Sequence, residues 1–237
     1  MTRESDGKIN LSKGDSIMKI IYQGHSCFIV QGSKESVIID PFLNGNPLAK
    51  ISAKDVLVDW VLVTHGHGDH MGDAVEISKK NKAPIIGTFE LVNHCSALGA
   101  NGHAMHIGGS HDFPFGKVKL TIAFHGSSSE SGPMGNPCGF LVTMDGKTVY
   151  HAGDTGLFSD MALLAGVDCA LLPIGDNFTM GIEDAVKAAV LIKPKLAVPM
   201  HYNTFDLIKQ DPKDFGRGCE KAGIKARILN PGEAMEI

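Results

Sequence analysis

The sequence predicts an α/β protein built from two β-sheets with helices outside them, and three observations support this class. Short β-rich segments separated by glycine-containing turns fill residues 18–40. In the last third of the chain, helical segments alternate with buried, strand-like runs, as in layered α/β proteins. Glycine is frequent, with 28 among 237 residues, whereas average proteins contain about 7%. Many tight turns and close backbone approaches are therefore expected.

The first half of the chain is predicted to contain mostly strands. Residues 59–64 form a continuous apolar run, which is typical of a strand covered on both faces. Asp40 and Pro41 end the preceding strand in a loop that is rich in turn residues. The predicted strands are 19–23, 26–30, 36–40, 59–64 and 84–87, and the predicted helices are 72–80 and 89–98.

The second half contains the alternation of strands and helices. The helix at 182–192 begins with Glu183 and Asp184, whose charges complement the helix dipole, and Pro194 ends it. A second helix is predicted at 213–222, followed by Gly223. The predicted strands are 118–124, 139–144, 147–151, 169–173, 196–200 and a last strand near 227–229.

Composition excludes several classes of protein. The chain has 22 Lys and Arg against 26 Asp and Glu, a net charge of −4, so no nucleic-acid partner is expected. The longest apolar runs are about five residues, far below the ~20 that a membrane span needs. Five cysteines without a CxxC motif favour a reduced, cytoplasmic setting. Residues 1–17 are polar and are expected to be a disordered extension or a cloning remnant before a single domain at 18–237.

The strongest signal is the segment Thr-His-Gly-His-Gly-Asp-His from Thr64 to His70, which follows a predicted strand directly. Its two glycines favour a tight loop over a helix. His65 and His67 are two residues apart and can converge on one cation, whereas Asp69 and His70 can serve a second. Such ligands suit zinc first, with manganese, iron or nickel as alternatives. A surface loop that is rich in histidine by chance is the alternative explanation.

Three later strands are also predicted to end on a candidate ligand. These ligands are His125, Asp154 and His201. Each signal alone is weak, because a lone histidine at a strand end is often a core or surface residue. In a layered fold, however, the same ends of several strands gather in one cleft. Together with the histidine-rich loop they supply seven ligands, enough for two metal ions.

In this order, the loop and the three later ligands resemble the metallo-β-lactamase superfamily. Four segments resemble, more narrowly, its group of metal-dependent hydrolases that is related to the L-ascorbate-6-phosphate lactonases. These segments are Gly24–Cys27, His151–Thr155, Pro173–Gly181 and Pro199–Thr204. The resemblance covers residues 18–237. It implies a four-layer αββα sandwich, the metallo-β-lactamase fold, with the site in the cleft between the sheets.

The resemblance further implies a set of metal ligands in which no position of the family pattern is missing. The first ion would be held by His65, His67 and His125, the second by Asp69, His70 and His201, and Asp154 would bridge the two. Related diiron oxygen and nitric oxide reductases carry glutamate where this chain has His67. This difference favours a hydrolytic function over a redox function.

We therefore expect a dinuclear metal-dependent hydrolase whose metal-bound hydroxide attacks a small-molecule lactone, ester or phosphorylated metabolite. Asp69 or Asp154 would orient the hydroxide and accept its proton. His151 would be either a proton donor or a residue that supports the ligands. Two alternatives stay open: a phosphodiesterase on cyclic or short nucleotides, and a non-catalytic metal-binding sensor. Association into a homo-oligomer is also left open.

Four residues near the ligands are candidates for substrate binding. The family resemblance places His25, in the turn between the first two strands, near the cleft, although a purely structural histidine is an equal alternative. The other three are short polar residues on loops beside ligands, namely Asn177, Asn203 and Thr204. Ordinary turn chemistry is the alternative explanation for these three.

Overall fold

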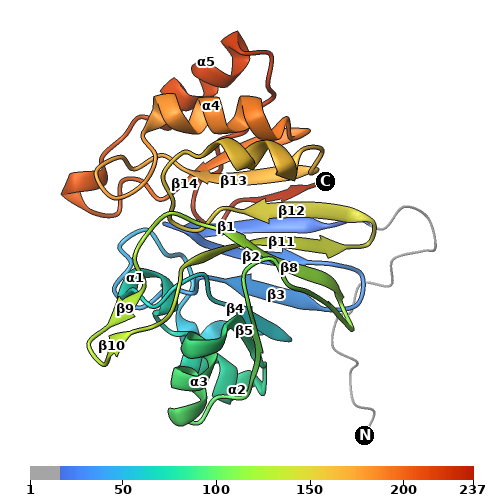
Figure 1. Cartoon of the computed structure of the whole chain (residues 1–237), viewed down its shortest axis with the longest axis vertical. Helices are drawn as coiled ribbons and strands as arrows, with labels where there is room; N and C mark the ends of the chain where they lie inside the picture. The colour runs from blue at the N-terminus through green and yellow to red at the C-terminus, as the bar shows by residue number, and fades with distance from the viewer. Residues whose placement is uncertain (1–16) are drawn as a thin grey trace, which may run out of the picture.

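The computed structural model describes residues 17–237, so the extension predicted for residues 1–17 lies, except for Ile17, outside the described residues. The described chain forms two mixed β-sheets and a short hairpin (Figure 1). Helices lie on the outer side of each sheet. This arrangement confirms the predicted α/β class and its two-sheet architecture.

The first sheet has seven strands in the order β15-β1-β2-β3-β4-β5-β6. Strands β15, β1, β2 and β3 pair antiparallel, and β3, β4, β5 and β6 pair parallel. Their bounds are β1 Lys19–Gly24, β2 Cys27–Gln31, β3 Ser36–Ile39, β4 Trp60–Leu62, β5 Ile85–Thr88, β6 Gly102–Met105 and β15 Ala234–Glu236.

The second sheet has six strands in the order β14-β13-β12-β11-β8-β7. Strands β12, β13 and β14 are parallel, and the remaining pairs are antiparallel. The strands are β7 Ser110–Phe113, β8 Gly116–Ile122, β11 Cys138–Met144, β12 Lys147–His151, β13 Cys169–Pro173 and β14 Leu196–Met200. The separate hairpin joins β9 Ser128–Ser129 to β10 Gly132–Pro133.

Two groups of helices cover the outer faces of the sheets, as Figure 1 shows. In the first sheet, α2 (Ala74–Asn81) packs against β4 and β5, and α3 (Phe89–Ala97) packs against β5 and β6. α4 (Ile182–Ile192) packs on β13 of the second sheet, and α5 (Pro212–Lys221) packs on α4 and β14. Short helices are α1 Gly68–Met71, η1 Ala53–Asp55, η2 Ser159–Leu164 and η3 Asp206–Ile208.

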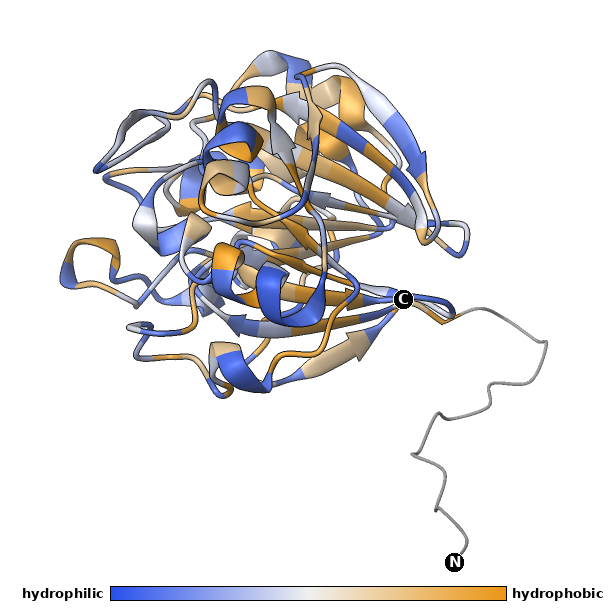
Figure 2. Cartoon of the chain, turned by 90° about the horizontal axis from the view of Figure 1, so that it is seen from below, coloured by the Kyte–Doolittle hydropathy of each residue, from blue (hydrophilic) through white to orange (hydrophobic). Residues whose placement is uncertain are grey.

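Alternating side chains explain why the first sheet is covered on both faces. In β4, Leu62 joins the core between the two sheets, whereas Val61 packs in the cluster under α2 and α3. In β5, Ile86 likewise lies in the core between the two sheets, and Ile85 lies in the cluster under α2 and α3. Successive residues of a strand point to opposite faces of the sheet. A strand that is apolar at every position therefore needs an apolar layer on each face of its sheet. Hydrophobic residues accordingly concentrate in the central strands (Figure 2).

The helix predicted at 72–80 is confirmed as α2, which begins at Ala74 because Gly72, with a φ of +33°, ends the short helix α1 before it. Other local expectations were wrong. The last strand is β15 rather than 227–229, where Ala226 forms only an isolated bridge with Ala197. The strands β6 and β7 were not predicted. Within residues 17–237, no helix has both the length and the apolar character that crossing a membrane would require.

Candidate metal centre

All seven predicted ligands lie at one end of the two sheets, where strands give way to loops. The histidine-rich loop follows β4, His125 follows β8, Asp154 follows β12, and His201 follows β14 directly. The backbone of His201 is bonded across the sheets, because its N–H donates to the carbonyl of His25 at 2.8 Å. The turn between β1 and β2 and the end of β14 are therefore fixed together beside the site.

Three histidines form the first cluster of ligand atoms. His65, His67 and His125 each offer a ring nitrogen, and these nitrogens lie within 4.8 Å of one another. The His65 Nε2 and His67 Nδ1 atoms are 3.0 Å apart. His65 is buried, whereas His67 and His125 are partly exposed, so this cluster opens to solvent on one side. Three imidazoles in this arrangement are a suitable ligand set for a divalent transition metal.

The second cluster contains Asp69, His70 and His201, together with His25. Asp69 and His70 lie on α1, so the second half of the motif is helical and the expected continuous loop was wrong there. His67 precedes this helix with extended backbone angles, and its carbonyl accepts the N–H groups of His70 and Met71. Because the backbone changes from loop to helix after His67, the side chains of the two halves of the motif lie in different clusters.

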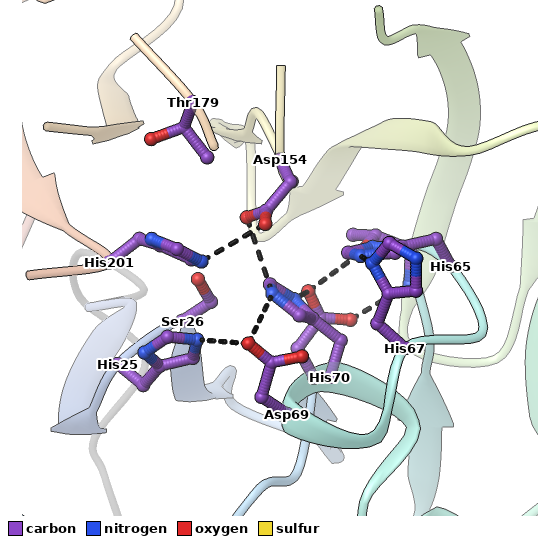
Figure 3. A network of polar contacts seen from close by, with 12 residues as sticks. His25, Ser26, His65, His67, Asp69, His70, Asp154, Thr179 and His201 are labelled. Carbon is purple, nitrogen blue, oxygen red and sulfur yellow. Dashed lines mark hydrogen bonds and ion pairs between the residues drawn. The ribbon is translucent and has the colours of Figure 1, made fainter. Parts of the chain in front are cut away.

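Asp154 lies between the two clusters (Figure 3). Its Oδ2 is 3.0 Å from His201 Nε2 and 3.6 Å from His125 Nε2, and its Oδ1 is 3.3 Å from His70 Nε2. One carboxylate therefore reaches ligands of both clusters. This is the position that a bridging ligand must occupy.

Unsatisfied buried atoms test whether these residues fit metal ions. Within residues 17–237, hydrogen-bond partners are missing for three atoms that face one another, His70 Nε2, Asp154 Oδ1 and His201 Nε2. A buried polar atom without a partner costs about 1–3 kcal/mol. These atoms meet at the point where a cation would satisfy them, so the residues fit a metal centre.

The electrostatics of the clusters favour ionised carboxylates. Burial opposes ionisation of Asp154, but His201 and His70 outweigh burial and hold the pKa of Asp154 well below its usual value. For Asp69, the hydrogen bond from His25 and the charge of His70 likewise outweigh burial and lower the pKa. Burial also lowers the pKa of His65 well below its ordinary value. For His70, burial lowers the pKa, but the Asp154 and Asp40 carboxylates outweigh burial and hold it well above its ordinary value. Metals bind ionised carboxylates and neutral imidazoles, so His70 must lose a proton when it binds an ion.

Asp40 is a functional residue that the sequence analysis missed. It follows β3, is fully buried, and accepts three hydrogen bonds: from Thr64 N at 2.8 Å, Thr64 Oγ1 at 2.7 Å and His70 Nδ1 at 2.8 Å. Because Nδ1 of His70 donates to Asp40, the neutral His70 ring carries no hydrogen on Nε2. The lone pair of Nε2 therefore faces the site. A clue existed in the sequence, since Asp40 ends a buried strand just as the predicted ligands do.

His151, predicted as either a proton donor or a residue that supports the ligands, has backbone partners at both nitrogens. It is buried, its Nε2 donates to the carbonyl of Ser26 at 2.8 Å, and its Nδ1 accepts the Gly153 N–H at 3.2 Å. Because Gly153 directly precedes Asp154, these bonds favour the supporting role. The role of proton donor stays a prediction.

The four predicted substrate-binding residues have different environments. His25 is fully buried, and its nitrogens contact Thr204 Oγ1 at 2.9 Å and Asp69 Oδ2 at 3.1 Å. Burial, followed by the charge of His201, lowers the pKa of His25 to about 4. Asn203 is exposed, and its side chain accepts the Gln210 N–H, which braces the loop. Asn177 is exposed in a turn after Asp176. Substrate binding by Asn177 and Asn203 stays a prediction.

Gly175 leaves room for His201. A methyl group at Gly175 would overlap the carbonyl oxygen of His201 and lie 3.0 Å from its Nδ1. We expect Gly175→Ala to destabilise the fold by about 1–3 kcal/mol through overpacking and to reduce bound metal by displacing His201. Thermal unfolding and elemental analysis measure both effects. Gly216→Ala, whose methyl group would meet only Ile228 at 3.6 Å, is the control. It should leave bound metal unchanged and raise stability by about 0.5–1 kcal/mol, since Gly216 lies inside helix α5.

Comparison with known proteins agrees with this geometry. A family model described as a beta-lactamase superfamily domain matches residues 19–201. A UPF0173 metal-dependent hydrolase of Pelotomaculum thermopropionicum is 53% identical over 229 residues, which cover 93% of this chain and 100% of that protein. A UPF0173 metal-dependent hydrolase of Bacillus cereus is 52% identical with the same coverage.

Solved structures share the fold. Igni18, described as a metallo hydrolase from the hyperthermophilic archaeon Ignicoccus hospitalis, matches with a TM-score of 0.87 and 39% identity over 93% of this chain and 98% of that chain. YhfI from Bacillus subtilis, a metallo-β-lactamase fold protein, matches with a TM-score of 0.75 and 14% identity over 94% of this chain and 100% of that chain. The chain therefore belongs to the metallo-β-lactamase superfamily, in its UPF0173 group of metal-dependent hydrolases.

Proposed function

We propose that this protein is a dinuclear metal-dependent hydrolase that cleaves a small lactone or ester. One observation carries the proposal: the Asp154 carboxylate lies within 3.6 Å of histidines from both ligand clusters. A carboxylate in this position supports two ions held close together rather than two independent sites. Zinc is the first candidate, and manganese, iron and nickel suit the same ligands.

In this proposal each cluster holds one ion. The first would be bound by His65, His67 and His125, the second by Asp69, His70 and His201, with Asp154 shared between them. When bound, such ions acidify water and stabilise negative charge on a polarised carbonyl. The substrate would approach from the side where His67, Asp69 and His125 are partly exposed.

Asp69 is suited to orient the attacking water. Its side chain is 27% exposed, whereas that of Asp154 is 3% exposed, so Asp69 is the site carboxylate that solvent reaches more easily. Its Oδ2 accepts the hydrogen bond from His25, which makes Oδ1 the atom that would accept a proton from water. Asp154 would mainly fix the position of the two ligand clusters relative to each other.

Two phenylalanines beside the second cluster favour an apolar group on the substrate. The rings of Phe42 and Phe205 lie 5.7 Å and 5.5 Å from the ring of His25, between centroids, and 6.3 Å from each other. Phe205 is 40% exposed. Gly72 packs on the backbone of Phe42, where a Cβ atom would lie 2.9 Å from its Cα. An aliphatic or aromatic substituent of a lactone or ester would fit against this apolar surface.

A substrate panel tests the proposal. Protein loaded with zinc or manganese should hydrolyse lactones or esters with apolar substituents, and a chelator should abolish this activity until metal is restored. Phosphodiesters and phosphorylated lactones belong in the same panel. Activity restricted to phosphodiesters would instead support the nucleotide phosphodiesterase, and two bound ions without turnover on any compound would support a sensor. Either result would overturn the proposed substrate class.

A further inference from the structure

His25 connects two loops that approach the second cluster from different sheets. It lies in the turn between β1 and β2, yet its Nδ1 contacts the Oγ1 of Thr204, which follows β14, at 2.9 Å. Its Nε2 contacts Asp69 Oδ2 at 3.1 Å. Thr204 is 8% exposed, and the side chain of His25 is fully buried. A side chain with both nitrogens engaged and no exposed surface cannot bind substrate directly.

The direction of these hydrogen bonds follows from the chemistry of the partners. An ionised carboxylate only accepts hydrogen bonds, so Nε2 of His25 must donate to Asp69. The hydroxyl of Thr204 then satisfies Nδ1 and fixes the plane of the imidazole. Two hydrogen bonds thus link the three side chains in the order Thr204, His25, Asp69. Figure 3 shows its last link, from His25 to Asp69.

We propose that Thr204 and His25 are positioning residues that hold Asp69 where it binds the second metal ion. The inference rests on the proposed dinuclear centre. It assigns to these two residues a role in metal affinity instead of the substrate contact expected from the sequence.

Asp69 needs such support because its own element is short. Helix α1 has four residues and ends at Gly72. The 27% exposure of the Asp69 side chain leaves it room to turn toward solvent. A hydrogen bond to a metal ligand from an outer residue is typically worth a factor of about 10–100 in metal affinity. The first cluster consists of His65, His67 and His125, which these hydrogen bonds do not involve. Loss of the hydrogen bonds from Thr204 through His25 to Asp69 should therefore weaken binding of the second ion only.

The test is a zinc titration of Thr204→Val and Thr204→Ser against the unchanged protein, with a competing chelator. Valine has the shape of threonine but lacks the hydroxyl that contacts His25. We expect Thr204→Val to lower the affinity for the second zinc equivalent by about tenfold or more and to leave the affinity for the first equivalent unchanged. Thr204→Ser retains a hydroxyl and should restore most of the affinity.

A second variant and a matched control complete the design. His25→Asn suits the backbone, since asparagine tolerates the φ of +57° at this position, and it should weaken the same equivalent. Thr143→Val removes a comparable hydroxyl bond, to Thr148 Oγ1 at 2.9 Å on the second sheet, and should not affect zinc binding. Unchanged affinity for the second zinc in both Thr204→Val and His25→Asn would overturn the inference. Failure of the unchanged protein to bind two zinc ions would instead overturn the proposed function.

Discussion

Replacing Asp154 with asparagine is expected to lower the metal content below two ions per chain and to reduce hydrolysis by about 100-fold or more, since loss of a residue that only supports a ligand already costs about 10–100-fold. Asparagine keeps the shape of the side chain but removes its charge and one of its two acceptor oxygens. Oδ2 lies 3.6 Å from His125 Nε2 of the first cluster, and Oδ1 lies 3.3 Å from His70 Nε2 of the second. One amide cannot serve both clusters, so at least one ion should bind weakly.

Elemental analysis and hydrolysis rates on the active panel substrate measure this effect. Asp168→Asn is a suitable control, because Asp168 accepts the Thr148 N–H and pairs with Lys195, both outside the ligand clusters. Asp168→Asn should keep the full metal content and rate. An Asp154→Asn protein that retains both would show that Asp154 does not bridge the ions.

Replacing Asp40 with asparagine is expected to weaken binding of the second metal ion by about 10–100-fold, although Asp40 touches no ion. Oδ2 of Asp40 accepts hydrogen bonds from Thr64 Oγ1 and from His70 Nδ1. An amide nitrogen in place of Oδ2 donates instead of accepting, so His70 Nδ1 would have to lose its hydrogen. The proton would then sit on Nε2, the atom that faces Asp154 at 3.3 Å.

Backbone strain does not complicate the Asp40→Asn test. Asp40 has a φ of +47°, a conformation that asparagine tolerates well. Zinc titration measures the affinity, and nitrogen chemical shifts of the His70 ring report which nitrogen carries the hydrogen. If Asp40→Asn binds the second ion as tightly as the unchanged protein does, the orientation of His70 does not depend on Asp40.

Much of this site could be predicted because its ligands follow strands closely in sequence. His125 and His201 stand at the ends of apolar runs, and parallel strand ends share one edge of a sheet. The same reasoning predicted most strands and the helices α2, α3, α4 and α5 within a few residues. Apolar periodicity in these elements reflects burial that the fold requires.

Other features depend on contacts that periodicity does not encode. The strand β6 has no buried residue and pairs only with β5, at the edge of its sheet, so its sequence lacks an apolar pattern. The roles of His151 and His25 depend on partners 125 and 179 residues away, namely Ser26 and Thr204. Histidine in a motif signals a site, but only tertiary contacts decide whether it binds metal or positions a ligand.

Anomalous diffraction can show whether the seven side chains hold two ions with Asp154 between them. Data from crystals grown with zinc would be recorded on both sides of the zinc absorption edge. Two peaks are expected, one at His65, His67 and His125 and one at Asp69, His70 and His201. A single peak, or peaks remote from Asp154, would show that these residues do not form a dinuclear centre.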